Sequence, residues 1–274
     1  GSYQALNLCD EMQLYGISPD SITFVCILKV CGALGAIHIG VKIHANKIVR
    51  EELEKGNVFL GNALINMYAK CGAIQEAHEA FGQLPTRNVA SWSTLFSGYV
   101  ENGQCEEALD LFEKMQLEDG IKPDVVSFVC ILRACGIIGA LDKGEEIRSM
   151  ICQMGLFVNN LSIGNAVVDM YAKCAMLTKA QEVLEELHVR DVATWNTLIA
   201  GYVQQGQYHE ALTCFERMQS DGLSTNAMTY ICILKACGGA GAMEKGIQIH
   251  KEIKECLATM NHGMLMELKP SETI

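Results

Sequence analysis

The sequence predicts an all-α protein built from stacked pairs of helices, and three observations lead to this prediction. The chain repeats itself, since NALINMYAKCGAIQEA (62–77) returns as NAVVDMYAKCAMLTKA (165–180), 103 residues later. Within the repeated segments, apolar residues recur at spacings of three and four, as on one face of an amphipathic helix. No segment alternates apolar and polar residues in the way of a half-buried strand.

Two further segments share the long period. SWSTLFSGYVENGQCEEALDLFEKMQ begins at Ser91 and returns from Thr194, and FVCILKVCGALGAI begins at Phe24 and returns from Phe128 and Tyr230. The long period therefore holds three kinds of motif in a fixed order. We set the motif boundaries at 21–57, 58–88, 89–124, 125–160, 161–191, 192–226 and 227–261. Residues 1–20 match the second half of the 89–124 motif, and residues 262–274 form a divergent tail.

Each motif is expected to form two helices. In the 89–124 motif, the turn at Asn102-Gly103 separates two apolar helical patterns, and Gly120 and Pro123 end the second one. One helix pair cannot bury its apolar face, but stacked neighbours bury it for one another, which makes a solenoid. We interpret the recurring aromatic residues as the core between helices, with base stacking as the alternative. These residues are Trp92, Trp195, Tyr68, Tyr171, Tyr99 and Tyr202.

Composition narrows the function classes. Half of the residues are hydrophobic, and no apolar run reaches the roughly 18 residues of a membrane-spanning helix. The thirteen cysteines lie inside apolar helical patterns, so we interpret them as reduced side chains and not as a disulfide framework. The net charge of −11 argues, for the chain as a whole, against nucleic acid as a partner.

The charges are unevenly distributed, however. The expected first helices of the motifs contain five basic residues and only two acidic residues, while many acidic residues fall in the second helices. The bases are Lys29, Lys70, Arg133, Lys173 and Lys235, and the acids are Glu101 and Asp169. If the first helices line one surface, that surface is mildly basic. The alternative interpretation is that these bases only solvate a helix face.

No catalytic pattern is visible in the sequence. Zinc deaminases need H-x-E and P-C-x-x-C segments, and the chain has neither. Cysteines five apart on a helix, such as Cys26 and Cys31, point about 140° from each other, which is poor geometry for chelation. His44 and His250 share a motif position that holds Arg148 in the third copy, so we do not interpret them as metal ligands. We expect no enzyme activity, no metal and no cofactor.

NALINMYAKCG, SWSTLFSGYVENGQCEEALDLFEKM with GIKPD, and FVCILRACGIIGALDKGEEI resemble the S, P and L motifs of the plant class of the pentatricopeptide repeat family. By this resemblance 58–88 and 161–191 are S motifs, 89–124 and 192–226 are P motifs, 21–57, 125–160 and 227–261 are L motifs, and 1–20 is part of a P motif. The resemblance covers residues 1 to about 257. It implies a right-handed superhelix of helix-turn-helix repeats that binds single-stranded RNA in mitochondria or chloroplasts.

The resemblance also implies which residues meet the RNA. In the family, the fifth and last residues of a motif select the base, so the expected pairs are Asn62 with Asn88, Ser93 with Asp124, Asn165 with Asp191, and Asn196 with Asn226. Their correspondence implies a pyrimidine, G, U and a pyrimidine, in 5′ to 3′ order. The L motifs hold Val25, Val129 and Ile231 at the fifth place and should read nothing by hydrogen bonding. We expect Lys70, Lys173 and Arg133 to contact phosphates.

Two features qualify this expectation. Asn, Ser and Asp are also preferred helix caps and turn residues, so a purely structural role for the eight pair residues is the alternative. The second residue of a motif is often valine in the family, whereas here it is Phe59, Ala90, Ser162 and Ala193, which suggests poorer base stacking.

The leading functional expectation is the site-recognition part of an organellar C-to-U editing or processing factor, with no membrane association. A deaminase-bearing or other editing factor would then act in trans. A protein-binding scaffold of tetratricopeptide type is the main alternative. Because the chain begins within a motif and its tail diverges, a fragment or truncated product is a further expectation.

Overall fold

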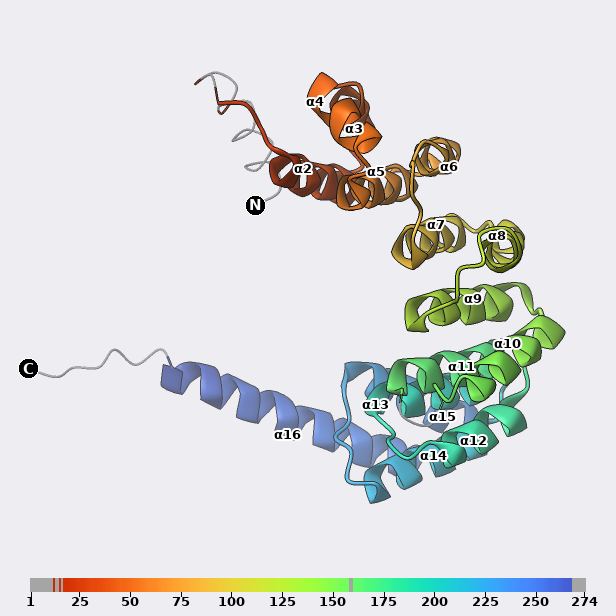
Figure 1. Cartoon of the computed structure of the whole chain (residues 1–274). Coiled ribbons are helices and arrows are strands. Elements are labelled where there is room, and N and C mark those ends of the chain that lie inside the picture. The colour runs from red at the N-terminus through yellow and green to blue at the C-terminus, as the bar shows by residue number, and fades with distance from the viewer. Residues whose placement is uncertain (1–11, 13–14, 16, 158–159, 268–274) are drawn as a thin grey trace, which may run out of the picture. The chain divides into compact units, whose positions relative to one another are not determined.

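The structure is a computed structural model that describes residues 12, 15, 17–157 and 160–267, with side chains as far as residue 255. Every regular element in these residues is an α-helix, which confirms the predicted all-α repeat solenoid (Figure 1). The chain divides into two compact units, residues 1–153 and 154–274. Most of the expected 1–20 motif lies outside the described residues. The right-handed superhelical course stays a prediction.

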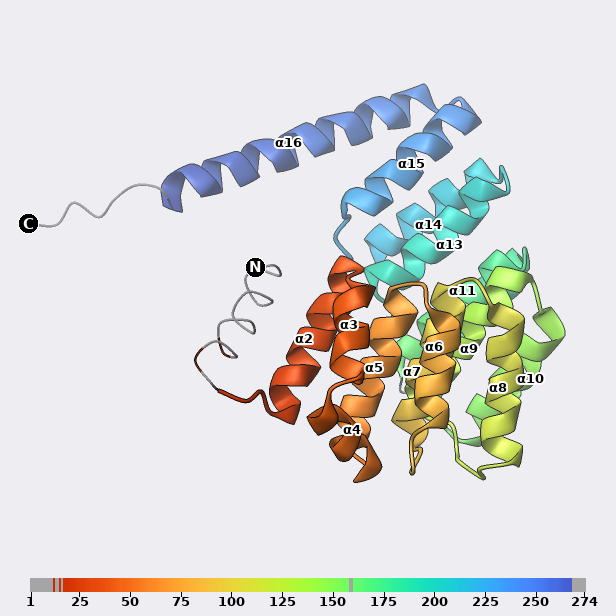
Figure 2. The same cartoon turned by 90° about the horizontal axis from the view of Figure 1, so that it is seen from above.

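The first unit contains two layers of helices. Its elements are α2 (Ser21–Leu34), α3 (Ile37–His44), α4 (Lys47–Glu54), α5 (Val58–Lys70), α6 (Ile74–Gly82), α7 (Val89–Glu101), α8 (Cys105–Leu117), α9 (Val125–Ile138) and α10 (Leu141–Gln153). The first helices α2, α5, α7 and α9 pack one against the next in a row (Figures 1 and 2). The second helices of the motifs form the other layer, each packed on the first helix of its own motif.

The second unit repeats this arrangement. Its elements are α11 (Leu161–Lys173), α12 (Leu177–Glu186), α13 (Val192–Gln204), α14 (Tyr208–Ser220), α15 (Ala227–Ala240) and α16 (Met243–Glu267). The first helices α11, α13 and α15 form the row, and α12, α14 and α16 pack on them. Helix α16 runs past residue 261, where we set the end of the last motif, and residues 268–274 of the expected tail lie outside the described part.

Aromatic side chains form the core between the layers. All six recurring Trp and Tyr residues are at most 6% exposed, which confirms their interpretation as core. In the first unit the Trp92 ring packs edge-on against Phe81, with 4.6 Å between the ring centroids, and lies 5.9 Å from Phe96. Phe96 in turn contacts Phe112 of the other layer. Buried aromatic contact thus links the helix pair of the 58–88 motif to that of the 89–124 motif.

The 21–57 motif departs from the expected two helices, because its second helix is interrupted at Ala45 and Asn46. The Asn46 side chain accepts the Ile48 N–H at 2.9 Å and so starts α4 as a separate helix. An asparagine that caps a new helix competes with continuation of the preceding one. The other two motifs of this kind have continuous second helices, α10 and α16.

The turn between the two helices needs a left-handed residue. In the 58–88 motif this residue is Gly72, with φ of 78°. In the 161–191 motif the same place holds Ala175, with φ of 63°. A side chain in this conformation costs about 1–2 kcal/mol, because Cβ approaches the following carbonyl oxygen.

This difference predicts opposite effects for two reciprocal substitutions. Ala175→Gly should raise the free energy of unfolding by about 1 kcal/mol, and Gly72→Ala should lower it by about the same amount. Space does not interfere, because Ala175 is exposed and a Cβ on Gly72 would come no closer than 3.9 Å to Asn102. Urea unfolding followed by circular dichroism measures both changes. Equal signs for the two variants would contradict the strain at Ala175.

Candidate nucleic-acid interface

The last residue of each motif caps the first helix of the next one. Counting each motif from the first residue of its first helix, the cap side chain accepts the N–H of the third residue of the following motif at 2.8–3.2 Å. The caps are Asn57, Asn88, Asp124, Asn160, Asp191 and Asn226. The last residues therefore cap helices, and their role in selecting bases stays a prediction.

The fifth residues do not cap helices, so the alternative interpretation as helix caps is wrong for them. They lie one turn inside the first helix and extend toward the cap that ends their own motif. The Asn165 amide donates to both carboxylate oxygens of Asp191 at 3.4 Å, and Asn196 donates to Asn226 at 3.2 Å. The Ser93 hydroxyl lies 3.5 Å from Asp124. The fold thus joins residues some thirty positions apart into side-chain pairs, which we call fifth-and-last pairs.

The pair of Asn62 and Asn88 is the exception. Among the described residues, the buried Oδ1 of Asn62 has no hydrogen-bond partner. The Ser91 hydroxyl next to it donates to Asn88 at 3.1 Å instead. A buried acceptor without a partner is rare in proteins.

Hydroxyl groups at the third position of the following motif complete the other pairs. Thr229 contacts Asn196 at 2.8 Å, Ser127 contacts Ser93 at 2.9 Å, and Thr194 donates to Asn165. All three hydroxyl residues are fully buried. The sequence interpretation missed them, although Ser or Thr at this position in five of the seven motifs was a visible signal.

In the first unit these residues line a groove of about 490 Å³ along the row of first helices. Asn62, Ser93 and Asp124 contribute polar atoms, and Phe59 and Val126 contribute exposed apolar side chains. Lys29 lies at the same groove. Three of the four pair residues of this unit, all but Asn88, therefore share one hollow surface.

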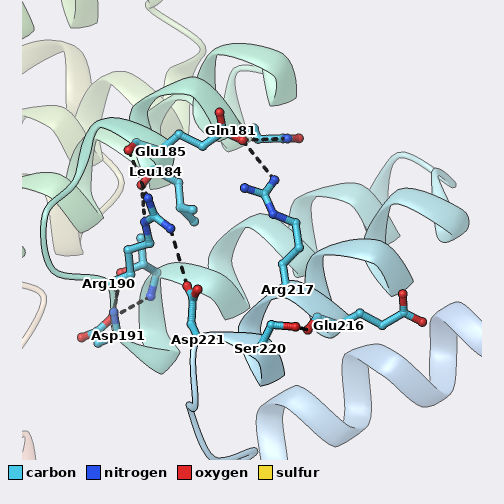
Figure 3. Close-up of polar contacts among 10 residues, drawn as sticks. Gln181, Leu184, Glu185, Arg190, Asp191, Glu216, Arg217, Ser220 and Asp221 are labelled. Atoms are coloured by element: carbon cyan, nitrogen blue, oxygen red, sulfur yellow. Dashed lines mark hydrogen bonds and ion pairs between the residues drawn. The ribbon is translucent and has the colours of Figure 1, made fainter.

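Arginine side chains hold the linkers that carry two of the caps. In the second unit Arg190 donates to the carbonyl groups of Leu184 and Glu185 at the end of α12, at 2.9 and 3.1 Å (Figure 3). It also pairs with Asp221 after α14 at 3.6 Å. Arg87 makes the related contact in the first unit, donating to the Gly82 carbonyl at 3.2 Å. Each arginine directly precedes a cap and so fixes its position.

Comparison with known sequences identifies the repeat. A family profile described as the PPR repeat family matches residues 87–136 and 190–239, and a profile described as the PPR repeat matches 62–89, 165–192 and 228–256. The chain belongs to the pentatricopeptide repeat family. Its division into P, L and S motifs stays a prediction.

Curated relatives come from Arabidopsis thaliana. One pentatricopeptide repeat-containing protein is 35% identical over 245 residues, which are 89% of this chain and 43% of the relative. Another, named chloroplastic, is 30% identical over 92% of this chain and 29% of its own length. A third, named mitochondrial, is 33% identical over 92% and 24%. The chain thus spans about a quarter to two fifths of these relatives.

Solved structures support the same fold. The crystal structure of the pentatricopeptide repeat protein PPR10 from maize superposes with a TM-score of 0.70 at 25% identity, covering 99% of this chain and 37% of that one. PPR10 in complex with an 18-nucleotide psaJ RNA element superposes with a TM-score of 0.61 at 18% identity, covering 94% and 43%.

The three residues of this pentatricopeptide repeat chain that are expected to contact RNA phosphates, Lys70, Arg133 and Lys173, differ in their surroundings. Within the described residues, no ion pair or hydrogen bond engages Lys70 or Arg133, and both are exposed. Lys173 is instead held by Asp169, one helical turn away, at 2.7 Å. Lys173 is therefore a weaker candidate than the other two, because a phosphate must compete with an existing ion pair.

The pentatricopeptide repeats offer no metal-binding cluster of three His, Cys, Asp or Glu within the described residues. His44 bonds the Tyr68 hydroxyl at 2.9 Å, and burial lowers its pKa. The described cysteines form no disulfide with one another, and burial raises the pKa of Cys214 to about 11, which keeps this thiol protonated. In the same part of the chain, no helix has the length and apolarity to cross a membrane.

The charge state of Asp191 depends on its neighbours. Burial raises its pKa, but hydrogen bonds from the Thr194 N–H and hydroxyl and from the Asn165 amide outweigh burial, so the pKa lies below its ordinary value. Asp191 therefore stays a carboxylate, which can only accept hydrogen bonds.

This lowered pKa predicts a pH-dependent contribution to stability. A carboxyl group with a lowered folded pKa stabilises the folded state above its unfolded pKa, and this contribution is lost as pH falls through the folded pKa. Since asparagine also caps helices well, the stability advantage of the wild type over Asp191→Asn should be largest at pH 6 and shrink below about pH 4. Urea unfolding at a series of pH values measures it. A difference that does not change with pH would contradict the prediction.

Proposed function

We propose that the chain binds single-stranded RNA along the row of first helices in each unit and selects bases with its fifth-and-last pairs. One observation carries this proposal. In three motifs the fifth residue contacts the last residue of the same motif, although some thirty residues separate them. Each such pair places two polar side chains side by side, and in the second unit two pairs lie in successive motifs. Single-stranded bases are read by hydrogen bonds to their exposed edges.

The last residue can distinguish two classes of base. Uracil and guanine carry an N–H on the Watson–Crick edge where cytosine and adenine carry a lone pair. A carboxylate can only accept a hydrogen bond, whereas an amide can also donate one. Asp124 and Asp191 therefore suit G or U, and Asn88 and Asn226 suit C or A.

The fifth residue can distinguish bases by size. Ser93 is shorter than Asn165 and leaves more room beside its cap, which favours a purine at the 89–124 motif. Together with the family's correspondence, this gives a pyrimidine, G, any base, U and a pyrimidine for the motifs from 58 to 226. The 5′ end of the RNA would lie toward the N-terminus.

The 21–57 motif is suited to be a spacer. Its fifth residue is Val25, which cannot form a hydrogen bond. The amide of its cap Asn57 donates one of its two N–H groups to Glu52 of the same motif at 3.1 Å, which orients the amide toward its own motif. We propose that this motif, and by analogy 125–160 and 227–261, contributes length without selecting a base.

Second residues provide apolar contact for the bases. Phe59 is 85% exposed at the groove, and Val126 is 55% exposed there. An aromatic ring is a good platform for a base, with about 1–3 kcal/mol per stacked base. The expectation of poorer stacking is therefore revised at Phe59, and it is kept for Ala90, Ser162 and Ala193.

The relatives support a role in organelles. Two carry chloroplastic or mitochondrial names, and a solved relative of the same fold was crystallised with an RNA element. We propose an organellar RNA-binding protein without catalytic activity of its own, which acts in RNA editing or processing beside an editing factor in trans. Selection from a random RNA pool tests the proposal, and an unenriched pool would favour a protein-binding scaffold instead.

Base selection predicts that two reciprocal substitutions exchange preferences. Asp191→Asn should change the preference of the 161–191 motif from U to C, and Asn226→Asp should change that of the 192–226 motif from C to U, because donor and acceptor are exchanged. Each preference should change by roughly tenfold, the equivalent of about 1.4 kcal/mol. Competition binding with RNAs that differ at one position measures this. Both residues cap helices well, so a loss of binding to every sequence would contradict base reading.

The exposed side chains of Lys70 and Arg133 predict an effect on RNA affinity that does not depend on the RNA sequence. Lys70→Gln with Arg133→Gln should weaken binding equally for all sequences, because phosphate contacts position the strand without reading it. The slope of log affinity against log salt should fall by about 0.7 for each lost contact. Lys42→Gln with Lys114→Gln, on second helices, makes the same change in net charge and is the control. Equal effects of the two double variants would contradict a phosphate path along the first helices.

A further inference from the structure

The ninth residue of a motif varies together with the fifth residue of the same motif. In the three motifs whose fifth residue is apolar, the ninth residue is basic. These ninth residues are Lys29, Arg133 and Lys235. In the four motifs whose fifth residue is polar, the ninth residue carries no positive charge. The motifs that we propose as spacers are therefore the ones with a cation at this position.

The ninth residue lies on the same face of the first helix as the fifth, because residues four apart on a helix are neighbours, about 6 Å along its axis. Val25 and Lys29 of the 21–57 motif both line the groove of the first unit. The pair residues Asn62, Ser93 and Asp124 line the same groove. The charge of Lys29 thus lies on the surface that we propose for RNA, at a motif where no nucleobase is selected.

The three basic ninth residues are available to a ligand. All three are exposed, and within the described residues no hydrogen bond or ion pair engages them. A phosphate group can therefore approach Lys29, Arg133 or Lys235 without displacing an existing partner. Lysine binds phosphate as a point charge, and arginine binds it through paired N–H donors, so either residue suits such a contact.

The acidic residues of the first helices are engaged by their own helices. Asp169 pairs with Lys173 at 2.7 Å, and Glu101 accepts the Ser97 hydroxyl at 3.2 Å. Neither acid forms an ion pair with a basic ninth residue in the described part of the chain. The positive charges of the ninth position are therefore not neutralised by direct contact.

Solvation of the helix face does not explain the pattern. A face that is only solvated accepts charged and neutral residues alike, and the four motifs with a polar fifth residue show this freedom. The repeated motifs 58–88 and 161–191 have Asn66 and Asp169 at the ninth position, and 89–124 and 192–226 have Ser97 and Ala200. In the other three motifs the residue type changes between lysine and arginine, but the positive charge is kept.

We propose that the motifs with an apolar fifth residue are phosphate-binding steps, in which Lys29, Arg133 and Lys235 each contact a phosphate group of single-stranded RNA. Phosphate contacts fix the position of a strand without reading its sequence. These motifs would hold the strand in register while the fifth-and-last pairs of the other motifs select bases. The inference rests on the proposed RNA-binding function and adds a role for motifs that select no base.

The first experiment compares two triple variants of the full chain. Lys29→Gln with Arg133→Gln and Lys235→Gln removes the three ninth-position charges. Because a phosphate contact on a single strand contributes about 0.7 to the slope of log affinity against log salt, this slope should fall by about 2. The affinity ratio of wild type to variant should then shrink roughly twentyfold between 50 and 200 mM salt.

The control variant has the same net charge. It carries Lys42→Gln, Lys114→Gln and Lys254→Gln, which replace exposed lysines on the second helices α3, α8 and α16. None of these lysines forms an ion pair in the part of the chain that the structure describes. The control should keep the wild-type slope. Circular dichroism checks that both triple variants remain helical.

The second experiment locates the contacts on the RNA. The RNA enriched by pool selection is synthesised with one uncharged methylphosphonate at a time. At the steps next to the three phosphate-binding motifs, the replacement should weaken binding more for the wild type than for the ninth-position variant. At the other steps the two proteins should lose affinity equally. Base preference should stay within about twofold of the wild type in the ninth-position variant, since phosphate contacts carry no sequence information.

The outcomes separate the phosphate-binding role from the proposed function. Polyuridylate is the unselected strand for comparison. If the wild type binds neither RNA at 50 mM salt, both claims are wrong. If it binds both RNAs equally, base selection fails, and the salt slopes of the two triple variants still decide the phosphate-binding role. If it prefers the selected RNA and the two triple variants have equal slopes, the proposed function stands and the phosphate-binding role is wrong.

Discussion

One hydrogen bond recurs at every described junction between motifs, from the backbone N–H of a third residue to the side chain of the last residue before it. It starts the first helix, and it also holds the last residue of one motif against the first helix of the next. Because first helices pack in a row, the cap comes beside the fifth residue of its own motif. The fold and the proposed recognition of bases therefore depend on the same contact, which explains why capping and base reading are not exclusive roles.

The junctions are of two kinds. At some, a hydroxyl and a polar fifth residue extend the cap into a small hydrogen-bonded network, as around Asn196 and Asn226. At the junction of Asn57, Leu60 fills the same place and the cap amide is turned to Glu52. A buried network of polar groups is stable only when its members are satisfied, so the hydroxyl and the polar fifth residue are needed together. This gives the proposed division into base-selecting and spacer motifs a physical basis.

Net charge describes this molecule poorly. The chain carries a net charge of −11, but the row of first helices has few acids, and Lys29 lies at its groove. Ion pairs such as Lys143 with Glu113 and Arg217 with Glu185 engage acids of the second helices. Charges beyond a Debye length of about 8 Å are largely screened at physiological salt. The electrostatic potential on an RNA strand along the first helices would therefore come mainly from the Lys and Arg side chains nearby.

The sequence by itself determined the helical class, the period, the order of the motifs and the burial of the recurring aromatics. These features are local or periodic, and a repeated helix pair has few other ways to bury its apolar face. It also indicated the four pairs, but only through resemblance, and it left capping and base reading as alternatives for all eight residues. The tertiary structure showed that the last residues cap helices and that fifth residues contact them, because only the stacking of helices brings residues thirty positions apart together. It also decided the break at Asn46, the left-handed turn at Ala175, the engagement of Lys173 by Asp169 and the burial of the third-position hydroxyls. Each of these depends on which neighbours surround a side chain or backbone group in space, and periodicity along the chain does not contain that information.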